Sequence, residues 1–432
     1  MVDNIAAIRG RLDLRTPDSR RRLRLLALVG LSVGVPAPVM LAAGGTAGAD
    51  PIAGTAASAS VSTVYRWGVV GNRGAIQQLQ LDAPTAIAGI PTDAGRVTAI
   101  ATSNSDGYAL TNKGEVYAWG VGSYGELGDG RLPAYSTRAV RVRFPAGVRI
   151  TALPNPMPFD GGLAIDSKRE AFGWGLDGDG DLCAAGLVES LPERIPLSDV
   201  TLATGARTHS LFYSHGRAYA CGSGDAGELG DGSATSHATP VRVIGLPAGE
   251  RITALTSSWE GSGALLADGR YYDWGYNAAG QLGDGTTNDS PRPVEVDLPA
   301  PVTQVFQGGS GKTNGQTIAI LDNGQIYDWG ANGDGQLGNG TTTSSDTPIR
   351  LAISAGVAFT KVNSGGFATY AISSKGQLWD WGSNTEGQLG LGPTIRMETR
   401  PTNVGTRLTQ ISSTAQNVAG LGSSRGSDGQ GR

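Results

Sequence analysis

Beyond the first 45 residues, apolar and polar positions alternate in short runs, and glycine-containing turns separate the runs. Long helical patterns, with apolar residues three and four positions apart, are absent from this part of the sequence. Residues 251–275 show the order: a strand begins at Arg251, a second follows from Gly263, and a tight turn at Asp268 leads into a third from Tyr271. Short alternating runs bounded by turn residues indicate β-strands. The pattern therefore predicts an all-β protein.

One strand pattern, which ends in an aromatic residue and glycine, recurs seven times. Its penultimate position is held by Trp67, Trp119, Trp174, Cys221, Trp274, Trp329 and Trp381. The steps between these positions are 52, 55, 47, 53, 55 and 52 residues, a regularity that chance does not produce. A pair of strands precedes most copies and one strand follows. Four short antiparallel strands in each repeat of about 50 residues are typical of a β-propeller blade.

A glycine-rich loop follows five of the seven aromatic strands. Its copies are Gly125-Glu-Leu-Gly-Asp-Gly130, Gly227-Glu-Leu-Gly-Asp-Gly232, Gly280-Gln-Leu-Gly-Asp-Gly285, Gly335-Gln-Leu-Gly-Asn-Gly340 and Gly387-Gln-Leu-Gly-Leu-Gly392. A sixth copy, at 180–186, is degenerate, and the first, near Gly74, is barely recognisable. We expect the glycines to take positive φ angles and the central leucine to turn inward. We expect the Trp-Gly pair to lay its ring flat against a neighbouring sheet.

The combined signature resembles the regulator of chromosome condensation repeat. It reads Trp-Gly, four residues, Gly-Gln-Leu-Gly-x-Gly, and it is preceded by Ala-Leu and a glycine turn; the resemblance covers residues 61–421. WD repeats are shorter than this period, and kelch repeats arrange their glycines differently. The resemblance implies a propeller of four-stranded antiparallel blades.

The phase of the repeats predicts how the propeller closes. The first aromatic strand, 64–68, has no strand pair before it, whereas the last pair, at 408–413 and 418–421, has no aromatic strand after it. The two incomplete units complement one another, so we expect the N- and C-terminal strands to pair in a shared blade that leaves no open sheet edge. Seven aromatic strands and seven upstream pairs then predict a seven-bladed propeller.

The N-terminus has the order of a secretory signal. The basic cluster Ser19-Arg-Arg-Arg-Leu-Arg24 precedes an apolar stretch at 25–43, and Ala47-Gly-Ala49 provides small residues for cleavage before Asp50. We therefore interpret residues 1–49 as a signal peptide, with Sec and twin-arginine export both open. The alternative is a retained membrane anchor, because about 20 apolar residues can span a bilayer. Residues 50–60 then form a linker, 61–421 the propeller and 422–432 a disordered tail.

Charge and cysteine content exclude several classes of partner. The net charge is −4, and the chain after residue 49 has 27 basic and 35 acidic residues, a balance that disfavours nucleic acid. Three histidines and two cysteines predict neither a zinc site nor a cofactor site. Export permits a disulfide between Cys183, in a glycine position of its unit, and Cys221, in a tryptophan position. We expect two separate buried thiols instead.

A calcium site is the alternative interpretation of Asp177-Gly-Asp-Gly-Asp181. The segment lacks the glycine at loop position six and has Val188 where the acidic residue of position twelve is needed. It also occupies the register of the ordinary blade loop. We therefore expect no metal.

The loops between strands one and two, and between three and four, emerge on one face and are longer than the turns opposite. We expect any binding surface there. Seven residues are the candidates: Tyr124, Phe159, Arg207, His209, Trp259, Tyr276 and Phe367; Lys312 lies in the same group of loops. The alternative, which we favour for any single residue, is packing against a neighbouring blade. Trp259 stands apart because Ser, Glu and Gly surround it.

No catalytic constellation emerges from the sequence. His209 lies one residue later than the histidine that family members place in this strand motif, and His215 falls in a turn on the opposite face. No nucleophile, base and acid can be assembled around either residue. We therefore expect a protein without enzymatic activity.

The leading functional hypothesis is an exported scaffold that binds a protein through its loop-bearing face. Membrane association would require the N-terminal segment to be retained. The resemblance implies two further functions: guanine-nucleotide exchange on a small GTPase, if the chain is cytosolic, and inhibition of a secreted enzyme such as a β-lactamase. An extracellular enzyme or a carbohydrate-binding surface is a third class.

Overall fold

The structure is a computed structural model that describes residues 63–70, 79–183, 188–309, 313–414 and 417–422. Within these ranges it contains twenty-seven β-strands and one short 3₁₀ turn, η1 (Thr92–Ala94). The all-β prediction is confirmed. The segments interpreted as signal peptide and linker, and the tail after Gly422, lie outside the described residues. Among the described residues, no helix has the length and apolar character needed to cross a membrane.

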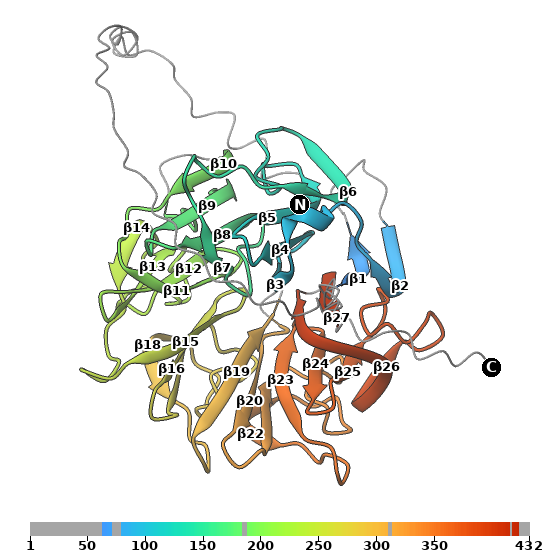
Figure 1. Cartoon of the computed structure of the whole chain (residues 1–432). Coiled ribbons are helices and arrows are strands. Elements are labelled where there is room, and N and C mark those ends of the chain that lie inside the picture. The colour runs from blue at the N-terminus through green and yellow to red at the C-terminus, as the bar shows by residue number, and fades with distance from the viewer. Residues whose placement is uncertain (1–62, 71–78, 184–187, 310–312, 415–416, 423–432) are drawn as a thin grey trace, which may run out of the picture. The chain divides into compact units, whose positions relative to one another are not determined.

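Five sheets have four antiparallel strands each, in the order of the sequence, as predicted for the repeated unit (Figure 1). The first two sheets are β3 (Val97–Thr102), β4 (Asp106–Thr111), β5 (Val116–Gly122), β6 (Ala134–Arg141), and β7 (Ile150–Ala152), β8 (Gly161–Asp166), β9 (Ala171–Leu176), β10 (Val188–Arg194). The third and fourth are β11 (Val200–Gly205), β12 (His209–Ser214), β13 (Arg217–Gly222), β14 (His237–Arg242), and β15 (Ile252–Ser257), β16 (Gly261–Leu266), β17 (Tyr271–Gly275), β18 (Ser290–Glu295). The fifth is β19 (Val302–Gly308), β20 (Gln316–Leu321), β21 (Ile326–Gly330), β22 (Ser345–Arg350).

The sixth sheet joins the two ends of the chain. Its strands, in spatial order, are β2 (Leu79–Ala86), β1 (Val64–Val70), β27 (Asn417–Gly422), β26 (Met397–Ser413), β25 (Gln377–Ser383), β24 (Ala368–Ser373) and β23 (Phe359–Ser364). The predicted pairing of the terminal strands is present: β1 and β27 run antiparallel with Val64 opposite Leu421, the blue and red strands that lie side by side in Figure 1.

Strand β26 differs from the sequence-based expectation. The pattern predicts a fourth strand for one unit and a separate first strand, 408–413, for the next. In the structure both belong to one strand of 17 residues, whose first part pairs with β25 and whose second part pairs with β27. Close to the point where the partner changes, Gly405 leaves the extended conformation (φ 81°), and the register shifts between Gln377 and Trp379 on β25.

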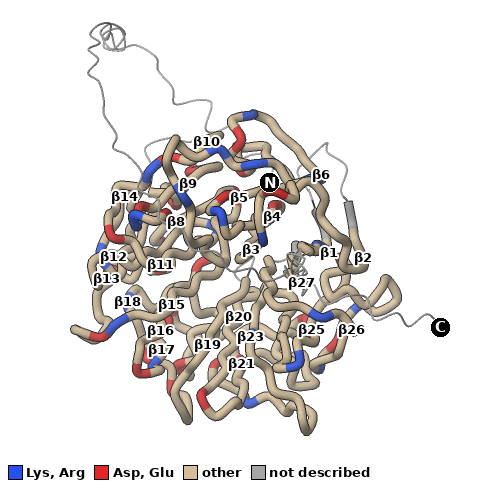
Figure 2. Tube along the Cα trace, in the orientation of Figure 1, with Lys and Arg blue, Asp and Glu red and all other residues tan. Residues whose placement is uncertain are grey.

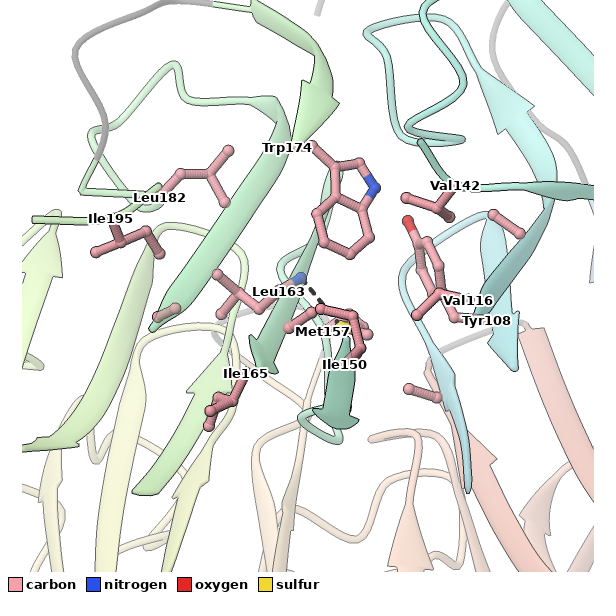
Figure 3. Packing of buried hydrophobic residues seen from close by; sticks show 14 of the residues in the cluster. Tyr108, Val116, Val142, Ile150, Met157, Leu163, Ile165, Trp174, Leu182 and Ile195 are labelled. Carbon is pink, nitrogen blue, oxygen red and sulfur yellow. Dashed lines mark hydrogen bonds between the residues drawn. The ribbon is translucent and has the colours of Figure 1, made fainter. Parts of the chain in front are cut away.

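The tryptophan rings connect successive sheets, as Figure 3 shows for Trp174 of β9. This ring is fully buried, meets the ring of Tyr108 on β4 edge-on at 5.9 Å and lies near Val142. Its Nε1 donates a 2.8 Å hydrogen bond to the carbonyl oxygen of Glu126, in the glycine-rich loop of the preceding sheet. The same bond is repeated by three other tryptophans: Trp274 to Glu228, Trp329 to Gln281 and Trp67 to Gln388. Each of these four buried indoles therefore has a polar partner, whereas Nε1 of the equally buried Trp381 makes no hydrogen bond to a described residue.

The glycine-rich loops have the predicted conformation. Their central leucines are buried: Leu127, Leu182, Leu229, Leu282, Leu337 and Leu389. The glycine after leucine has φ between 59° and 66° in five loops. A carboxamide earlier in the loop accepts the amide hydrogen of the leucine, for example Asn277 Oδ1 from Leu282 at 2.9 Å. In the acidic segment considered for calcium, Asp177 Oδ1 makes this contact with Leu182 at 2.8 Å, so that carboxylate has a structural partner.

The expectation of two separate thiols is wrong. Cys183 and Cys221 form a disulfide with their Cα atoms 5.6 Å apart, and no free cysteine remains. The bond joins the loop after β9 to β13 of the next sheet, and both residues are buried. They lie together because the glycine and tryptophan positions that they occupy are in contact wherever successive sheets pack.

Candidate functional site

The loops between first and second strands converge on one small cavity of about 50 Å³. Seven such loops contribute to its lining, with these residues: Asn104; Pro156, Met157 and Phe159; Gly205 to Arg207; Ser257 to Trp259; Phe306 to Gly309; Ser364 and Gly365; Ser413 and Thr414. Sites for drug-sized ligands and cofactors occupy roughly 300–1,000 Å³. This cavity accommodates the end of a side chain rather than a nucleotide or a cofactor.

Three of the predicted residues meet beside this cavity. Phe159 and Trp259 lie edge to face with ring centroids 5.8 Å apart. The guanidinium carbon of Arg207 lies over the Trp259 ring, 3.8 Å from its centroid, and 5.6 Å from the centroid of Phe159. We call these three residues the cation–aromatic cluster. They come from the β7–β8, β11–β12 and β15–β16 loops, so three successive sheets each supply one member.

Backbone hydrogen bonds tie the loops that carry the cluster to one another. The amide of Asn104 donates to the carbonyl oxygen of Phe159 at 3.1 Å, and the amide of Phe159 donates to the carbonyl oxygen of Ala206 at 2.9 Å. Thr208 Oγ1 then donates to the carbonyl oxygen of Trp259 at 3.3 Å. Each loop is thus bonded to the loop of the next sheet. Little conformational freedom is left to lose on binding, which favours recognition by a rigid surface.

Arg207 has no carboxylate partner among the described residues. Its side chain is exposed, and the salt bridges of the described chain involve other residues. The described residues that line the cavity include no aspartate or glutamate. Elsewhere basic and acidic residues are interspersed along the described trace (Figure 2). Arg207 is therefore the one charged side chain among the described residues that line the cavity, on a chain with a net negative charge.

Three other predicted residues do not join the cluster. Tyr124, Tyr276 and Phe367 are half-buried and do not line the central cavity. Tyr276 lies at a separate hollow, beside Thr313 and Asp346. Lys312 lies outside the described residues.

His209 requires a correction. It is fully buried, and its Nε2 lies 2.7 Å from the hydroxyl of Ser262 in the next sheet. Burial lowers the pKa of the imidazole to about 3, because the cation is poorly solvated there. His209 is therefore a neutral residue that packs between sheets, and it cannot touch a partner at the surface.

Sequence reasoning missed several residues of the cavity wall, notably Met157, Phe306 and Asn104. Asn104 and Met157 lie in the loops after the first strands β3 and β7, and Phe306 lies within the first strand β19. Alignment of the units by their first strands, rather than by their tryptophans, places Asn104 and Met157 at the point of the repeat that Arg207 and Trp259 occupy, and Phe306 three positions earlier. No group of three or more His, Cys, Asp or Glu residues within the described ranges has the arrangement of a metal site.

The family comparison matches four segments of the chain. The model of the Regulator of chromosome condensation (RCC1) repeat matches residues 215–265, 268–311, 323–372 and 375–420. The ultraviolet-B receptor UVR8 of Arabidopsis thaliana is 28% identical over 288 residues, which cover 65% of this chain and 63% of the receptor. The human E3 ubiquitin-protein ligase HERC2 is 25% identical over 303 residues, 67% of this chain but 6% of the ligase. The chain thus spans less than two thirds of the length of both relatives.

Solved structures of β-propellers share the fold. Human WBSCR16 superposes with a TM-score of 0.71 at 18% identity, covering 84% of this chain and 99% of that protein. Prp20p from Saccharomyces cerevisiae, whose structure was described with its binding to Gsp1p and histones, has a TM-score of 0.69 at 19% identity, covering 86% and 93%. The likeness confirms the β-propeller fold. The four segments that the model matches are thus repeats of the regulator of chromosome condensation family.

Proposed function

We propose that this chain is an exported, non-catalytic propeller scaffold that binds a protein through the loop face bearing the cation–aromatic cluster. The observation that carries this proposal is the cluster itself: Phe159, Arg207 and Trp259 come together from three sheets, and Arg207 is exposed. Aromatic and arginine side chains are enriched at the energetic centres of protein interfaces. The cavity beside them is too small for a substrate or cofactor, which favours a macromolecular ligand.

Two observations support export. The N-terminal sequence has the basic, apolar and small-residue order of a signal peptide. The disulfide Cys183–Cys221 is of a kind that persists in oxidising compartments and is rare in the cytosol. Amino-terminal sequencing of the native protein tests this part of the proposal. A start at Asp50 is expected, whereas an intact Met1 on cytosolic protein contradicts export and revives nucleotide exchange as a function.

We further propose that the sheets form a closed, seven-bladed wheel. The seven-stranded sheet can be divided at β26 into two four-stranded units, one of which contains both chain ends. This unit also contacts the first complete sheet: the hydroxyls of Thr102 and Ser412 are 2.7 Å apart. Gln410 Nε2 donates to the carbonyl oxygen of Thr98 at 2.7 Å. Deletion of residues 408–421 should therefore abolish cooperative unfolding, while deletion of 423–432 should leave it intact; equal heat resistance of both products contradicts closure.

Binding is tested by affinity capture from culture medium with the immobilised protein. Trp259→Ala should reduce recovery of a bound protein at least tenfold, because it removes the ring that supports Arg207. Tyr135→Ala is the matched control, since Tyr135 is an exposed aromatic residue on the outer strand β6. Circular dichroism of both variants confirms that they are folded. Equal recovery by the wild-type protein and by Trp259→Ala contradicts the proposed face.

A further inference from the structure

Arg207 is an unusual cation because it has aromatic support but no anionic partner. Its guanidinium carbon lies 3.8 Å from the centroid of Trp259, and no described carboxylate pairs with it. The chain after residue 49 has 35 acidic side chains against 27 basic ones, so acidic partners are abundant elsewhere. At the surface, Arg131, Arg169 and Arg270 each pair with a nearby aspartate. The lack of such a partner at Arg207 leaves a guanidinium available to an anion from outside.

The surroundings of Arg207 determine which kind of anion fits. A guanidinium over a ring keeps its N–H groups directed to the ring's periphery, where they can donate two parallel hydrogen bonds to one carboxylate. The cavity beside it, about 50 Å³, is of the order of one or two water volumes of about 30 Å³. Ser257, Ser258 and Ser364 line its wall, together with the apolar residue Phe306. These features suit a short carboxylate on an aliphatic stem.

We propose that Arg207 and the central cavity receive the carboxylate of an aspartate or glutamate side chain from the partner protein. The inference rests on the proposed function, because it assigns the chemistry by which the same face recognises its partner. Phe159 and Trp259 hold the guanidinium in place. Charge complementarity supports this occupant: the described lining has one cation and no anion.

The first experiment uses the protein with two small probes, N-acetylglutamate amide and N-acetylglutamine amide, which differ only in the carboxylate. Nuclear magnetic resonance follows the Arg207 Nε–H and Trp259 indole N–H signals. The glutamate probe should shift both signals in a saturable way, and the glutamine probe should bind at least tenfold more weakly. Arg207→Gln should abolish the difference between probes, and Arg207→Lys, which keeps the charge but not the planar fork, should restore only part of it. An equal response to both probes, or none up to solubility, overturns the inference.

The second experiment separates this inference from the proposed function. Arg207→Gln and Trp259→Ala are compared in the affinity capture, with N-acetylglutamate amide as competitor. Loss of the partner in both variants supports the inference. If only Trp259→Ala fails to capture the partner, the binding face is supported but the carboxylate assignment is overturned. If both variants still capture the partner, the binding face itself is contradicted. An Arg207-dependent dimer of the chain without any partner, detected by sedimentation, would show that a second copy is the occupant and would also overturn the inference.

Discussion

Cys183 and Cys221 replace the glycine and the tryptophan that meet wherever successive sheets pack. Gly128, in the loop position of Cys183, would place a Cβ atom 3.1 Å from the Trp174 ring, and Gly230 stands in the same relation to Trp274. At this one junction between sheets, a disulfide therefore replaces the packing of a tryptophan ring against a glycine. The bond closes a segment of 38 residues, for which chain-entropy arguments give a stabilisation of about 3–4 kcal/mol.

Reduction of this disulfide should lower the free energy of unfolding by up to about 3–4 kcal/mol, measured by denaturant titration with and without dithiothreitol. Cys221→Ser should cause a similar loss under oxidising conditions. The double variant Cys183→Gly/Cys221→Trp should recover part of the stability and no longer respond to reductant, since it rebuilds the contact of the other junctions. If the double variant is less stable than Cys221→Ser, the glycine–tryptophan contact rebuilt at this junction is not equivalent to the contacts at the other junctions.

Gly283→Ala should destabilise the protein more than Gly285→Ala, although both glycines have positive φ in the same loop (66° and 76°). A Cβ atom on Gly283 would lie 2.6 Å from Trp329 Nε1, whereas on Gly285 its nearest neighbour, Thr347 Cγ2, is 3.8 Å away. The Gly285→Ala variant is therefore the control: it measures backbone strain alone, about 1–2 kcal/mol. Thermal unfolding of both variants gives the additional cost of displacing the ring. Equal losses would show that the ring moves freely.

Glu228→Gln should stabilise the protein above neutral pH. Burial raises the pKa of Glu228 from 4.5 to about 7, and no described group pairs with its Oε1. A carboxyl with a raised pKa in the folded state contributes full stability below pH 4.5 and loses it as pH rises through 7. The expected gain at pH 8 is about 2–3 kcal/mol, with little gain at pH 4.5.

The reciprocal variant, Gln281→Glu, is the control for this prediction. Gln281 occupies the same loop position, and its Oε1 accepts the amide of Ala279 at 2.9 Å, as Glu228 Oε2 accepts the amide of Ala226 at 2.8 Å. This variant should lose stability above pH 7. The raised pKa of Glu228 would be refuted if the free energy of unfolding of both variants ran parallel to that of the wild-type protein between pH 4.5 and 8.

His209 should make the protein sensitive to mild acid. Its pKa is about 3 when folded and about 6.5 when unfolded, so protonation favours the unfolded chain. The contribution of His209 to the free energy of unfolding is present above pH 6.5 and is lost progressively as the pH falls toward 3. The stability difference between the wild-type protein and His209→Gln should narrow by about 2 kcal/mol between pH 7 and pH 5. A constant difference across this range would show that the imidazole is not buried as a neutral group.

Most of the correct predictions follow from the repeated strand pattern. Strand order, inward leucines and the pairing of β1 with β27 all follow from the local pattern and its phase. The disulfide was missed because it depends on contact between different units. The sequence places Cys183 in a glycine position and Cys221 in a tryptophan position, but it does not show that these positions are in contact across sheets. A pattern along one strand specifies neighbours within a sheet and leaves neighbours between sheets undetermined.

The candidate site was predicted less completely than the fold, for a related reason. Loop membership identified Phe159, Arg207 and Trp259, but their meeting depends on how three sheets are tilted toward each other. His209 was misplaced because its strand register turns it inward, toward Ser262. Polarity predicts a surface position only where the register of the neighbouring strand is known.

The bond between Trp67 and Gln388 connects residues 321 positions apart. Strand β1 pairs on one side with β2, which follows it in the sequence, and on the other side with the distant β27. Its sheet is complete only after β27 has been synthesised, and such distant pairing makes folding slow. Until then β1 is paired with β2 alone, and its other edge is open. The interval between the synthesis of β1 and that of β27 therefore governs how long this open sheet edge needs protection from aggregation.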